Sequence, residues 1–446
     1  MPALSQESRV CSASVDGDAT GAQGTSSADE PTGVVEETPP RRRRRGPPWA
    51  RLVIIIGTLV VVASGLTVAV PVLVARWAVS EIPQVDVIPT QMRGNDITGA
   101  INLLLIGIDE RDAGPDSDEL AKADSMVLVH IPADHNQVYM ISLPRDLRVK
   151  IPPFEPTGYS GHTYKINAAF ANGAKDADGR RDTSPVGRGL GAVLTMQTID
   201  DIVGCGAWQR EPQGGSWQGR RCTQPSTGPG LAWHGSAVIN FDGFDEIVQA
   251  LGGVHMCIDE DVYSIHYWTD GSPADGWMDQ WAEAHGRNPE TGYHYVKGEC
   301  RDLQPWEALD FSRQRIGVTG GDYGRHRHQQ QLIKAIVAKA ASTDTLTNLT
   351  TIQNLQRAAG GALTLDLGGT SVLDWAWTLR NLRADKITMI STYAGEPRGR
   401  SIDGEWFEPL EPELIELLQH VRDDTVTEFL ETHEDWVAKD PTPTAS

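Results

Sequence analysis

The pattern of apolar and polar residues first separates one uncharged stretch from the rest of the chain. Residues 52–75 carry no charge, and about 20 apolar residues are enough to cross a bilayer as a helix. The stretch ends at Arg76 and Trp77, whereas secretory signal peptides have apolar regions of only about 7 to 15 residues and end at small residues. The pattern therefore predicts an uncleaved transmembrane anchor over residues 52–75.

The segments around this anchor predict its orientation. Residues 1–50 are polar and almost without aromatic side chains, a composition that cannot offset the entropy of ordering, so we expect a disordered tail. The basic run 41–45 favours a cytoplasmic N-terminus, because positive flanks stay inside. We expect a single-pass plasma-membrane protein with a stalk over residues 76–100, an extracytoplasmic domain over 101–435, and a disordered tail over 436–446.

Beyond the anchor, helical and strand patterns alternate. The apolar run 102–108 predicts a buried strand. Segments 124–131 and 137–143 predict a hairpin around the turn-rich residues 132–136. The other expected elements are helices at 166–173, 190–203, 241–251, 305–313, 325–341, 370–380 and 412–431, and strands at 237–240, 254–258 and 386–391. This alternation predicts an α/β layered fold.

Four of the five cysteines follow the anchor, in a compartment where disulfides persist. Sequence allows three pairings, of which Cys205 with Cys222 and Cys257 with Cys300 close the shortest loops. No Cys-x-x-Cys pair occurs, which disfavours a structural zinc site. Residues 206–230 follow no sustained period and predict a long surface insertion, which a Cys205–Cys222 bridge would restrain.

The charge of the chain limits the classes of function that it can have. The chain has 39 Lys and Arg against 60 Asp and Glu, a net charge of -21, which disfavours a nucleic-acid partner. Arginines nevertheless concentrate in three turn-rich clusters, at residues 142–146, 311–315 and 321–330. Guanidinium groups suit bidentate contacts with oxyanions, so the clusters predict an anionic phosphate ligand. The alternative is that each arginine pairs with a surface carboxylate.

Two carboxylates occupy positions suited to a metal ion. Asp109 follows the first buried strand, and Asp124 opens the next one. If these strands are neighbours, the two carboxylates meet at one rim of the sheet, where hard oxygen ligands suit Mg²⁺ bridging to a phosphate. The alternative is that both are turn or cap carboxylates.

Eight motifs in this order, behind one anchor, resemble the LytR-CpsA-Psr family of cell-wall glycopolymer transferases. The motifs are residues 102–111, 123–125, 142–146, 165–169, 241–244, 251–254, 308–315 and 322–329. Three features depart from the family pattern. His328 stands where many relatives carry Arg, Ser125 replaces a frequent Thr, and the insertion 206–230 is additional.

The resemblance implies a mixed central sheet flanked by helices, in an α-β-α layered domain. It also implies Mg²⁺-dependent transfer of a polyprenyl-pyrophosphate-linked glycopolymer onto peptidoglycan as a phosphodiester, with apolar helices around the lipid tail. The implied site residues are the metal ligands Asp109 and Asp124, the catalytic residues Arg145, Arg313, Arg315 and Arg325, and the substrate-binding residues Arg111, Lys165, Asn167 and Gln329.

Two other functions share these features. In a polyprenyl-pyrophosphate phosphatase, water would replace the sugar acceptor. In a non-enzymatic, membrane-anchored regulator or lipid-carrier-binding protein, the carboxylates would be structural. The three hypotheses differ in whether a product forms and in whether its formation needs an acceptor.

Overall fold

The computed structural model defines the folded part of the chain. It describes residues 82–94, 96–108, 122–211, 219–226, 228–274, 276–342, 345 and 348–438. The predicted tail, the anchor at 52–75 and the Asp109 to Arg111 motif lie outside these residues. Of the helices within the described ranges, none has both the length and the apolar character to cross a bilayer.

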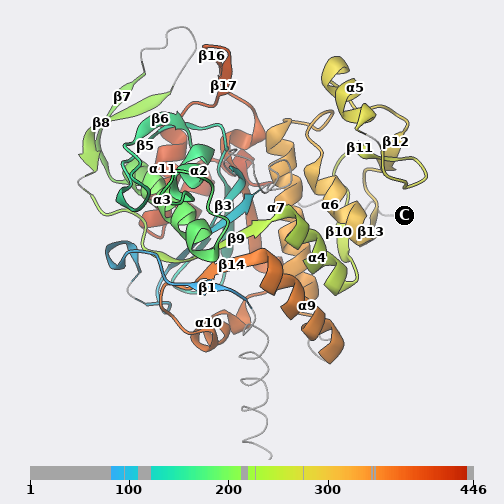
Figure 1. Cartoon of the computed structure of the whole chain (residues 1–446), viewed down its shortest axis with the longest axis horizontal. Helices are drawn as coiled ribbons and strands as arrows, with labels where there is room; N and C mark the ends of the chain where they lie inside the picture. The colour runs from blue at the N-terminus through green and yellow to red at the C-terminus, as the bar shows by residue number, and fades with distance from the viewer. Residues whose placement is uncertain are drawn as a thin grey trace, which may run out of the picture. The chain divides into compact units, whose positions relative to one another are not determined.

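A seven-stranded sheet forms the centre of the domain, in the order β1-β14-β9-β2-β3-β4-β15 (Figure 1). The strands are β1 Gln84–Val85, β2 Ile101–Ile108, β3 Ala123–Ile131, β4 Val138–Ser142, β9 Trp233–Asn240, β14 Leu363–Asp366 and β15 Ile387–Ser391. Strand β2 is antiparallel to β3 and parallel to β9, so the sheet is mixed. The predicted mixed α/β class and the hairpin β3–β4 are confirmed.

Helices cover both faces of this sheet (Figure 1). On one side lie α2 Asn167–Gly173, α3 Pro185–Val203 and α11 Pro412–Arg422, and on the other lie α4 Phe241–Leu251 and α7 Asp322–Ala340. Successive side chains of a strand point to opposite faces. In β3, Met126 and Leu128 enter the core that includes α3, whereas Val127 and Val129 pack in the core that includes Ile333 of α7. Each face therefore has its own apolar core.

A smaller group of elements follows α4 and has a separate core, which includes Tyr295, Phe311 and Leu332. The elements are β10 Val254–Cys257, β11 Val262–Trp268, α5 Trp277–His285, β12 Gly292–Tyr295, β13 Cys300–Leu303 and α6 Pro305–Arg313. Cys257 and Cys300 face each other in the β10–β13 pair and form a disulfide. Together with the Cys205–Cys222 bridge, this confirms the pairing with the shortest loops.

The remaining elements include several that the sequence patterns did not predict. They are β5 Arg148–Ile151, β6 His162–Lys165, β7 Cys205–Arg210, β8 Arg220–Ser226, α9 Leu349–Ala362, β16 Arg400–Ile402, β17 Glu405–Phe407 and, among the described residues, six short 3-10 helices. Helices α10 Val372–Thr378 and α12 Val426–Thr432 correspond to the predicted helix 370–380 and to the second part of the predicted helix 412–431. The Cys205–Cys222 bridge that was predicted to restrain the insertion 206–230 is present, but the sequence did not predict that β7 and β8 form an antiparallel hairpin there.

The boundaries of the folded domain also differ from the prediction. Within the predicted stalk, β1 pairs with β14 and Ile88 is buried. At the other end, Trp436 is buried, and the N–H of Ala438 donates to the carbonyl of Met389 at 2.9 Å. The folded chain therefore begins before residue 101 and continues beyond residue 435.

Candidate functional site

The carboxylate Asp124 occupies the rim at which β2 and β3 meet. Strand β2 pairs with β3, and Ile108 lies opposite Ala123, which confirms that these two strands are neighbours. Asp109 follows Ile108 directly in sequence but lies outside the described residues. The chain thus leaves β2 beside Asp124, as a shared metal site of the two carboxylates requires.

Arg145 joins Asp124 to the start of helix α7. It follows the end of β4, and its Nη1 donates to Asp124 Oδ1 at 2.6 Å, while its Nε lies 3.4 Å from Asp322 Oδ2. Burial disfavours the charge of Arg145, but Asp322, Asp124 and Asp146 overcome this effect and raise its pKa. Arg145 is therefore a fixed cation held by neighbouring carboxylates.

The first turn of α7 supplies the other half of the charge cluster. Arg325 Nη2 lies 2.8 Å from Asp322 Oδ1 and donates to the carbonyl of Asp124 at 3.3 Å. Burial would raise the pKa of Asp322, but His326, Arg325, Arg145 and Arg315 lower it. The sequence analysis did not predict Asp322 as a site residue. Its spacing from Arg325 by one helical turn was the available signal.

Part of this charge cluster lines a polar cavity of about 350 Å³. Arg145, Arg315 and Asp322 share this cavity with Asp146. Lys165 lies beside it, because its Nζ is 3.1 Å from Asp146 Oδ1. The cavity therefore places the guanidinium groups of Arg145 and Arg315 among the carboxylates of Asp146, Asp322 and Glu408.

Several buried polar atoms at this site have no hydrogen-bond partner within the described part of the chain. They include Asn167 Oδ1, Arg325 Nε and Gln329 Nε2. The backbone N–H of Asn167 donates to the carbonyl of Arg145 at 3.2 Å, which places Asn167 next to the cluster. Buried donors without partners are costly, so the two unpaired N–H groups fit an oxyanion that would accept from them.

A second, apolar cavity of about 210 Å³ lies between the sheet and helices α4, α6 and α7. Its lining includes Gly107, Val127, Ala237, Ile239, Phe244, Ile247, Leu309, Gln329, Ile333 and Ile336. Gln329 is one helical turn after Arg325, so the same side of α7 leads from the charge cluster into the apolar cavity. The site can therefore hold a charged head group and an attached hydrocarbon chain.

The predicted site residues do not all converge. The structure brings together Asp124, Arg145, Arg315 and Arg325, with Lys165 and Asn167 beside them and Gln329 at the apolar cavity. Arg313 closes α6 and does not line either of these two cavities as the described residues form them. Burial raises the pKa of Tyr267 in β11, and the positive charge of Arg313 opposes this rise. Asp109 and Arg111 lie outside the described residues.

His328 belongs to a different network. Its ring is fully buried, stacks on Phe311 at 4.0 Å between centroids, and lies with Nε2 3.0 Å from Asp259 Oδ1. Asp259, Glu260 and His328 could together ligate a metal ion, but Arg327 already bonds to both carboxylates. The network is therefore an ion-pair cluster that fixes α7, and His328 takes no part in the polar cavity.

Comparison with known proteins places this chain in a family. The family model described as LytR_cpsA_psr matches residues 78–207 and 230–423. A relative named polyisoprenyl-teichoic acid--peptidoglycan teichoic acid transferase TagU, from Oceanobacillus iheyensis, is 26% identical over 308 residues, which are 69% of this chain and 70% of that protein. Biofilm regulatory protein A of Streptococcus mutans is 23% identical over 310 residues, 68% of this chain and 58% of that protein.

Solved structures resemble the chain as well. Protein gbs0355 from Streptococcus agalactiae matches with a TM-score of 0.46 and 19% identity, over 78% of this chain and 92% of that one. TagV of B. subtilis matches with a TM-score of 0.44 and 17% identity, over 75% of this chain and 98% of that one.

Proposed function

The chain belongs to the LytR-CpsA-Psr family, and we propose that it transfers a glycopolymer from a polyprenyl-pyrophosphate carrier onto peptidoglycan as a phosphodiester. The observation that carries this proposal is the junction on α7 between the charge cluster of Arg145 and Arg325 and the apolar cavity. A pyrophosphate attached to an isoprenoid chain has the same division into anion and hydrocarbon. The name of the TagU relative supports a peptidoglycan acceptor.

In the proposed complex, Arg145, Arg315 and Arg325 bind the pyrophosphate, and the isoprenoid chain enters the cavity beside Ile333. Guanidinium groups make charge-assisted hydrogen bonds to phosphate oxygens, and Arg325 Nε is unpaired among the described residues. Gln329 lies between the two parts of the ligand and has an unpaired amide N–H. The arginines thus orient the pyrophosphate, and the apolar cavity holds the hydrocarbon chain away from water.

Asp124, the one of the two expected metal ligands that lies within the described residues, fits the magnesium ion that the family resemblance implies. Mg²⁺ is commonly held by one or two carboxylates together with substrate phosphates and waters. Asp124 uses one oxygen for Arg145, which leaves its second oxygen for a metal, and Asp109 would be the other ligand. When bound, Mg²⁺ withdraws charge from the pyrophosphate oxygens.

The reaction is a substitution at the phosphorus atom next to the sugar. The oxygen of an acceptor hydroxyl forms a bond to this phosphorus, the bond from phosphorus to the bridging oxygen breaks, and polyprenyl phosphate leaves. The hydroxyl proton passes to solvent. Arg145 and Arg325 stabilise the charge that develops on the phosphate oxygens, and such positioning and electrostatic stabilisation supply most of the acceleration in phosphoryl transfer.

The proposed function is tested with the full-length protein in detergent, a lipid-linked glycan, peptidoglycan oligomers and Mg²⁺. We expect a glycan–peptidoglycan conjugate and polyprenyl phosphate in equal amounts. Release of polyprenyl phosphate at the same rate without peptidoglycan, with water in place of the acceptor hydroxyl, would instead identify a phosphatase. Absence of both products with every donor, together with unchanged behaviour of an Arg145→Ala variant, would identify a non-enzymatic binding protein.

Filling the apolar cavity should separate binding of the lipid from the chemistry. Ile333→Trp places a larger ring in a cavity of about 210 Å³, so we expect the KM for a long-chain donor to rise about tenfold or more. The KM for a donor with a short, water-soluble chain should change little. Val186→Trp, at a position that is 51% exposed on α3, is the matched control. Equal effects on both donors would place the lipid elsewhere.

A further inference from the structure

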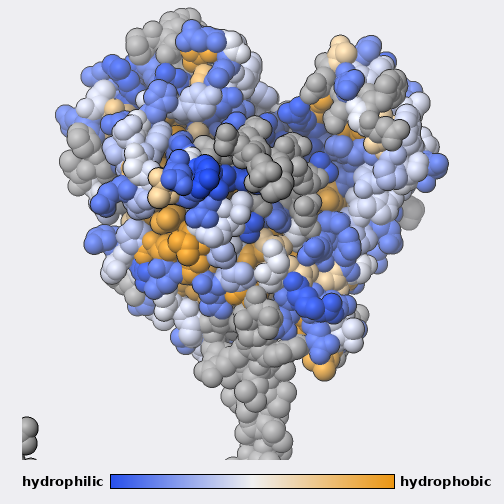
Figure 2. Space-filling model, viewed as in Figure 1, coloured by the Kyte–Doolittle hydropathy of each residue, from blue (hydrophilic) through white to orange (hydrophobic). Residues whose placement is uncertain are grey.

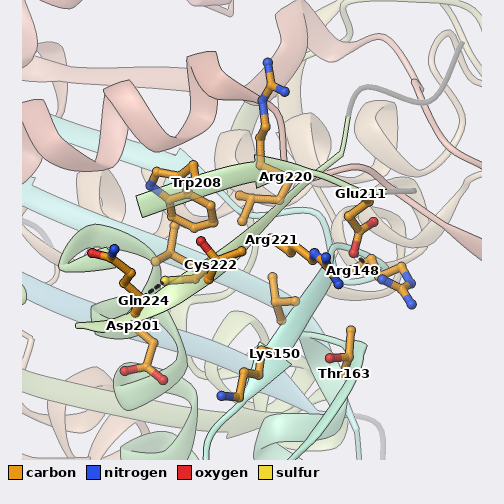
Figure 3. Close-up of a pocket in the computed structure, with 14 residues that line it drawn as sticks. Arg148, Lys150, Thr163, Asp201, Trp208, Glu211, Arg220, Arg221, Cys222 and Gln224 are labelled. Carbon is orange, nitrogen blue, oxygen red and sulfur yellow. Dashed lines mark hydrogen bonds and ion pairs between the residues drawn. The ribbon is translucent and has the colours of Figure 1, made fainter. Parts of the chain in front are cut away.

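A third cavity, of about 470 Å³, lies beneath the hairpin β7–β8 (Figure 3). The hairpin forms one wall, strands β5 and β6 form another, and Asp201 and Ile202 of α3 complete it. The two segments matched by the family model leave out residues 208–229, which hold most of this hairpin. The cavity is therefore built by an addition to the family fold, and the Cys205–Cys222 disulfide braces it.

The charges that line this cavity are mainly positive. They are Arg148, Lys150, Arg220 and Arg221 against Asp201 and Glu211. Arg148 forms an ion pair with the buried carboxylate of Glu211. Among the described residues, no carboxylate lies within 4.0 Å of Arg220 or Arg221. A local excess of cations in a chain with a net charge of -21 favours an anionic ligand.

The aromatic, hydroxyl and basic side chains that line the cavity also suit a carbohydrate. Figure 3 shows Trp208 and Arg221 on the hairpin, with Lys150 and Thr163 on the opposite wall. An indole ring offers an apolar face to a sugar, while hydroxyl and guanidinium groups bond to its polar substituents. Figure 2 shows mainly hydrophilic residues around β7 and β8, so a polar ligand fits this face better than a bilayer does.

The cavity is adjacent to the reaction site. Arg148 and Lys165 both lie over the ring of Phe407, at 5.8 Å and 5.5 Å from its centroid. Lys165 in turn pairs with Asp146 at 3.1 Å, and Asp146 lines the polar cavity of Arg145. A polymer whose reactive group lies beside Arg145 could therefore extend into the third cavity.

The position of the cavity favours the acceptor over the donor. The apolar cavity lies on the α4 and α7 side of the sheet, whereas Val149 and Ile202 of the third cavity belong to the core on the α3 side. The two substrates would thus approach the same rim from opposite sides. Peptidoglycan strands carry free carboxylates on their peptide stems, which match the guanidinium group of Arg221 in this cavity.

We propose that the cavity under the hairpin β7–β8 binds the carboxylate-bearing peptidoglycan acceptor beside the reaction site. The identity of the acceptor rests on the proposed function, but binding does not require the donor. Arg221, whose side chain points among the other lining residues (Figure 3), contacts a stem carboxylate, and Trp208 contacts the sugar rings. The hairpin thereby sets the affinity for the acceptor, while the Arg145 cluster performs the transfer.

The binding test uses the full-length protein in detergent micelles and soluble, uncrosslinked peptidoglycan fragments. One preparation has free stem carboxylates, and in the other they are amidated. We expect the wild type to bind the free-carboxylate fragments at least about tenfold more tightly, and the Arg221→Gln variant to lose about this factor. Arg357→Gln, on the exposed surface of α9, is the matched control and should bind as the wild type does.

Transfer kinetics provide the second readout. The Arg221→Gln variant should have a raised KM for the acceptor, with kcat and donor affinity retained. Unchanged acceptor binding, or a loss confined to donor affinity, would overturn the proposal, the latter because it would place the donor glycan in the cavity. If the wild type binds acceptor through Arg221 but forms no conjugate, the proposed transfer fails and the binding site stands.

The disulfide gives an independent check on the hairpin. A Cys205→Ser, Cys222→Ser variant should weaken binding of the free-carboxylate fragments severalfold, because the unbraced hairpin must be ordered by the ligand. Donor binding should be retained. A variant that binds the fragments as tightly as the wild type would contradict a role for the braced hairpin.

Discussion

Replacement of Arg145 by Ala is expected to lower kcat for glycopolymer transfer by about 10²- to 10³-fold, which corresponds to about 3–4 kcal/mol of transition-state stabilisation. Arg145 contacts Asp124 at 2.6 Å and lies 3.4 Å from Asp322, so it is fixed before substrate binds. A cation that needs no reorganisation stabilises developing charge most effectively. Steady-state transfer assays at saturating donor measure this loss.

Controls separate catalysis from folding in this experiment. Arg145→Lys keeps a positive charge but loses the planar group that reaches two carboxylates, so we expect intermediate activity. Arg357→Ala removes an exposed arginine of α9 and should leave kcat unchanged. Melting temperatures are compared because Arg145→Ala leaves Asp124 and Asp322 with fewer partners. A folded Arg145→Ala variant with wild-type kcat would remove the basis of the proposed mechanism.

The elements that sequence predicted well are those whose ends are marked by local chemistry. The helix α4 has the predicted bounds, because Asn240 caps its first turn and Gly252, with a φ of 72°, ends it in the left-handed region. The bounds of α6 also match, since Pro305 occupies its first turn and Glu307 completes a capping box. Strands β2, β3 and β4 follow from apolar runs that are buried on both faces.

The elements that were missed depend on long-range packing. Strand β14 has only four residues, yet it pairs with both β1 and β9. Strand β9 begins four residues before the prediction, because His234 and Ser236 are polar but buried. The predicted helix at 412–431 is divided at Asp424, whose φ is 57°. Such features arise from partners that are distant in sequence, so no local period indicates them.

The residue types of the site could be predicted from the sequence more completely than the arrangement of their side chains. The motifs placed Asp124, Arg145 and Arg325 in one group, and the structure brings them together. Arg313 and Arg315 are two residues apart, but α6 ends at Arg313 and Gln314 is extended, so the two side chains serve different neighbours. Sequence indicates that arginines cluster, whereas the end of a helix decides which of them reach the cavity.

One stripe of α7 connects the functional parts of the site. Arg325, Gln329 and Ile333 are spaced by four residues and therefore lie on one side of the helix. They lead from the charge cluster into the apolar cavity. On another side, Arg327 and His328 bond to Asp259 of the segment between β10 and β11. The placement of the catalytic stripe thus depends on a buried ion-pair network.

Asp259→Asn is therefore expected to lower the free energy of unfolding by about 3–5 kcal/mol, the usual cost of leaving buried charges without their partner. Asp259 Oδ1 lies 3.0 Å from His328 Nε2, and Oδ2 accepts from Arg327 at 2.5 Å and from Gln331 at 3.1 Å. The control is Asp302→Asn, which removes the carboxylate from a surface pair with His255 at 2.9 Å and should change stability little. Urea unfolding of the two variants measures the difference.

The same network predicts how stability depends on pH. Burial would lower the pKa of His328, but hydrogen bonds to Asp259 and Glu260 raise it, so its contribution is full below the ordinary histidine pKa of about 6.5 and is lost as pH rises through the folded value. Burial would raise the pKa of Asp259 and Glu260, yet both are lowered, chiefly by His328. The contribution of these two carboxylates to stability is present above the ordinary carboxyl pKa of about 4 and is lost in acid.

Wild-type stability should therefore decline both in acid and as the pH rises through the folded pKa of His328, and Asp259→Asn should flatten both declines. Identical profiles for the variant and the wild type would mean that the network does not hold α7 in place.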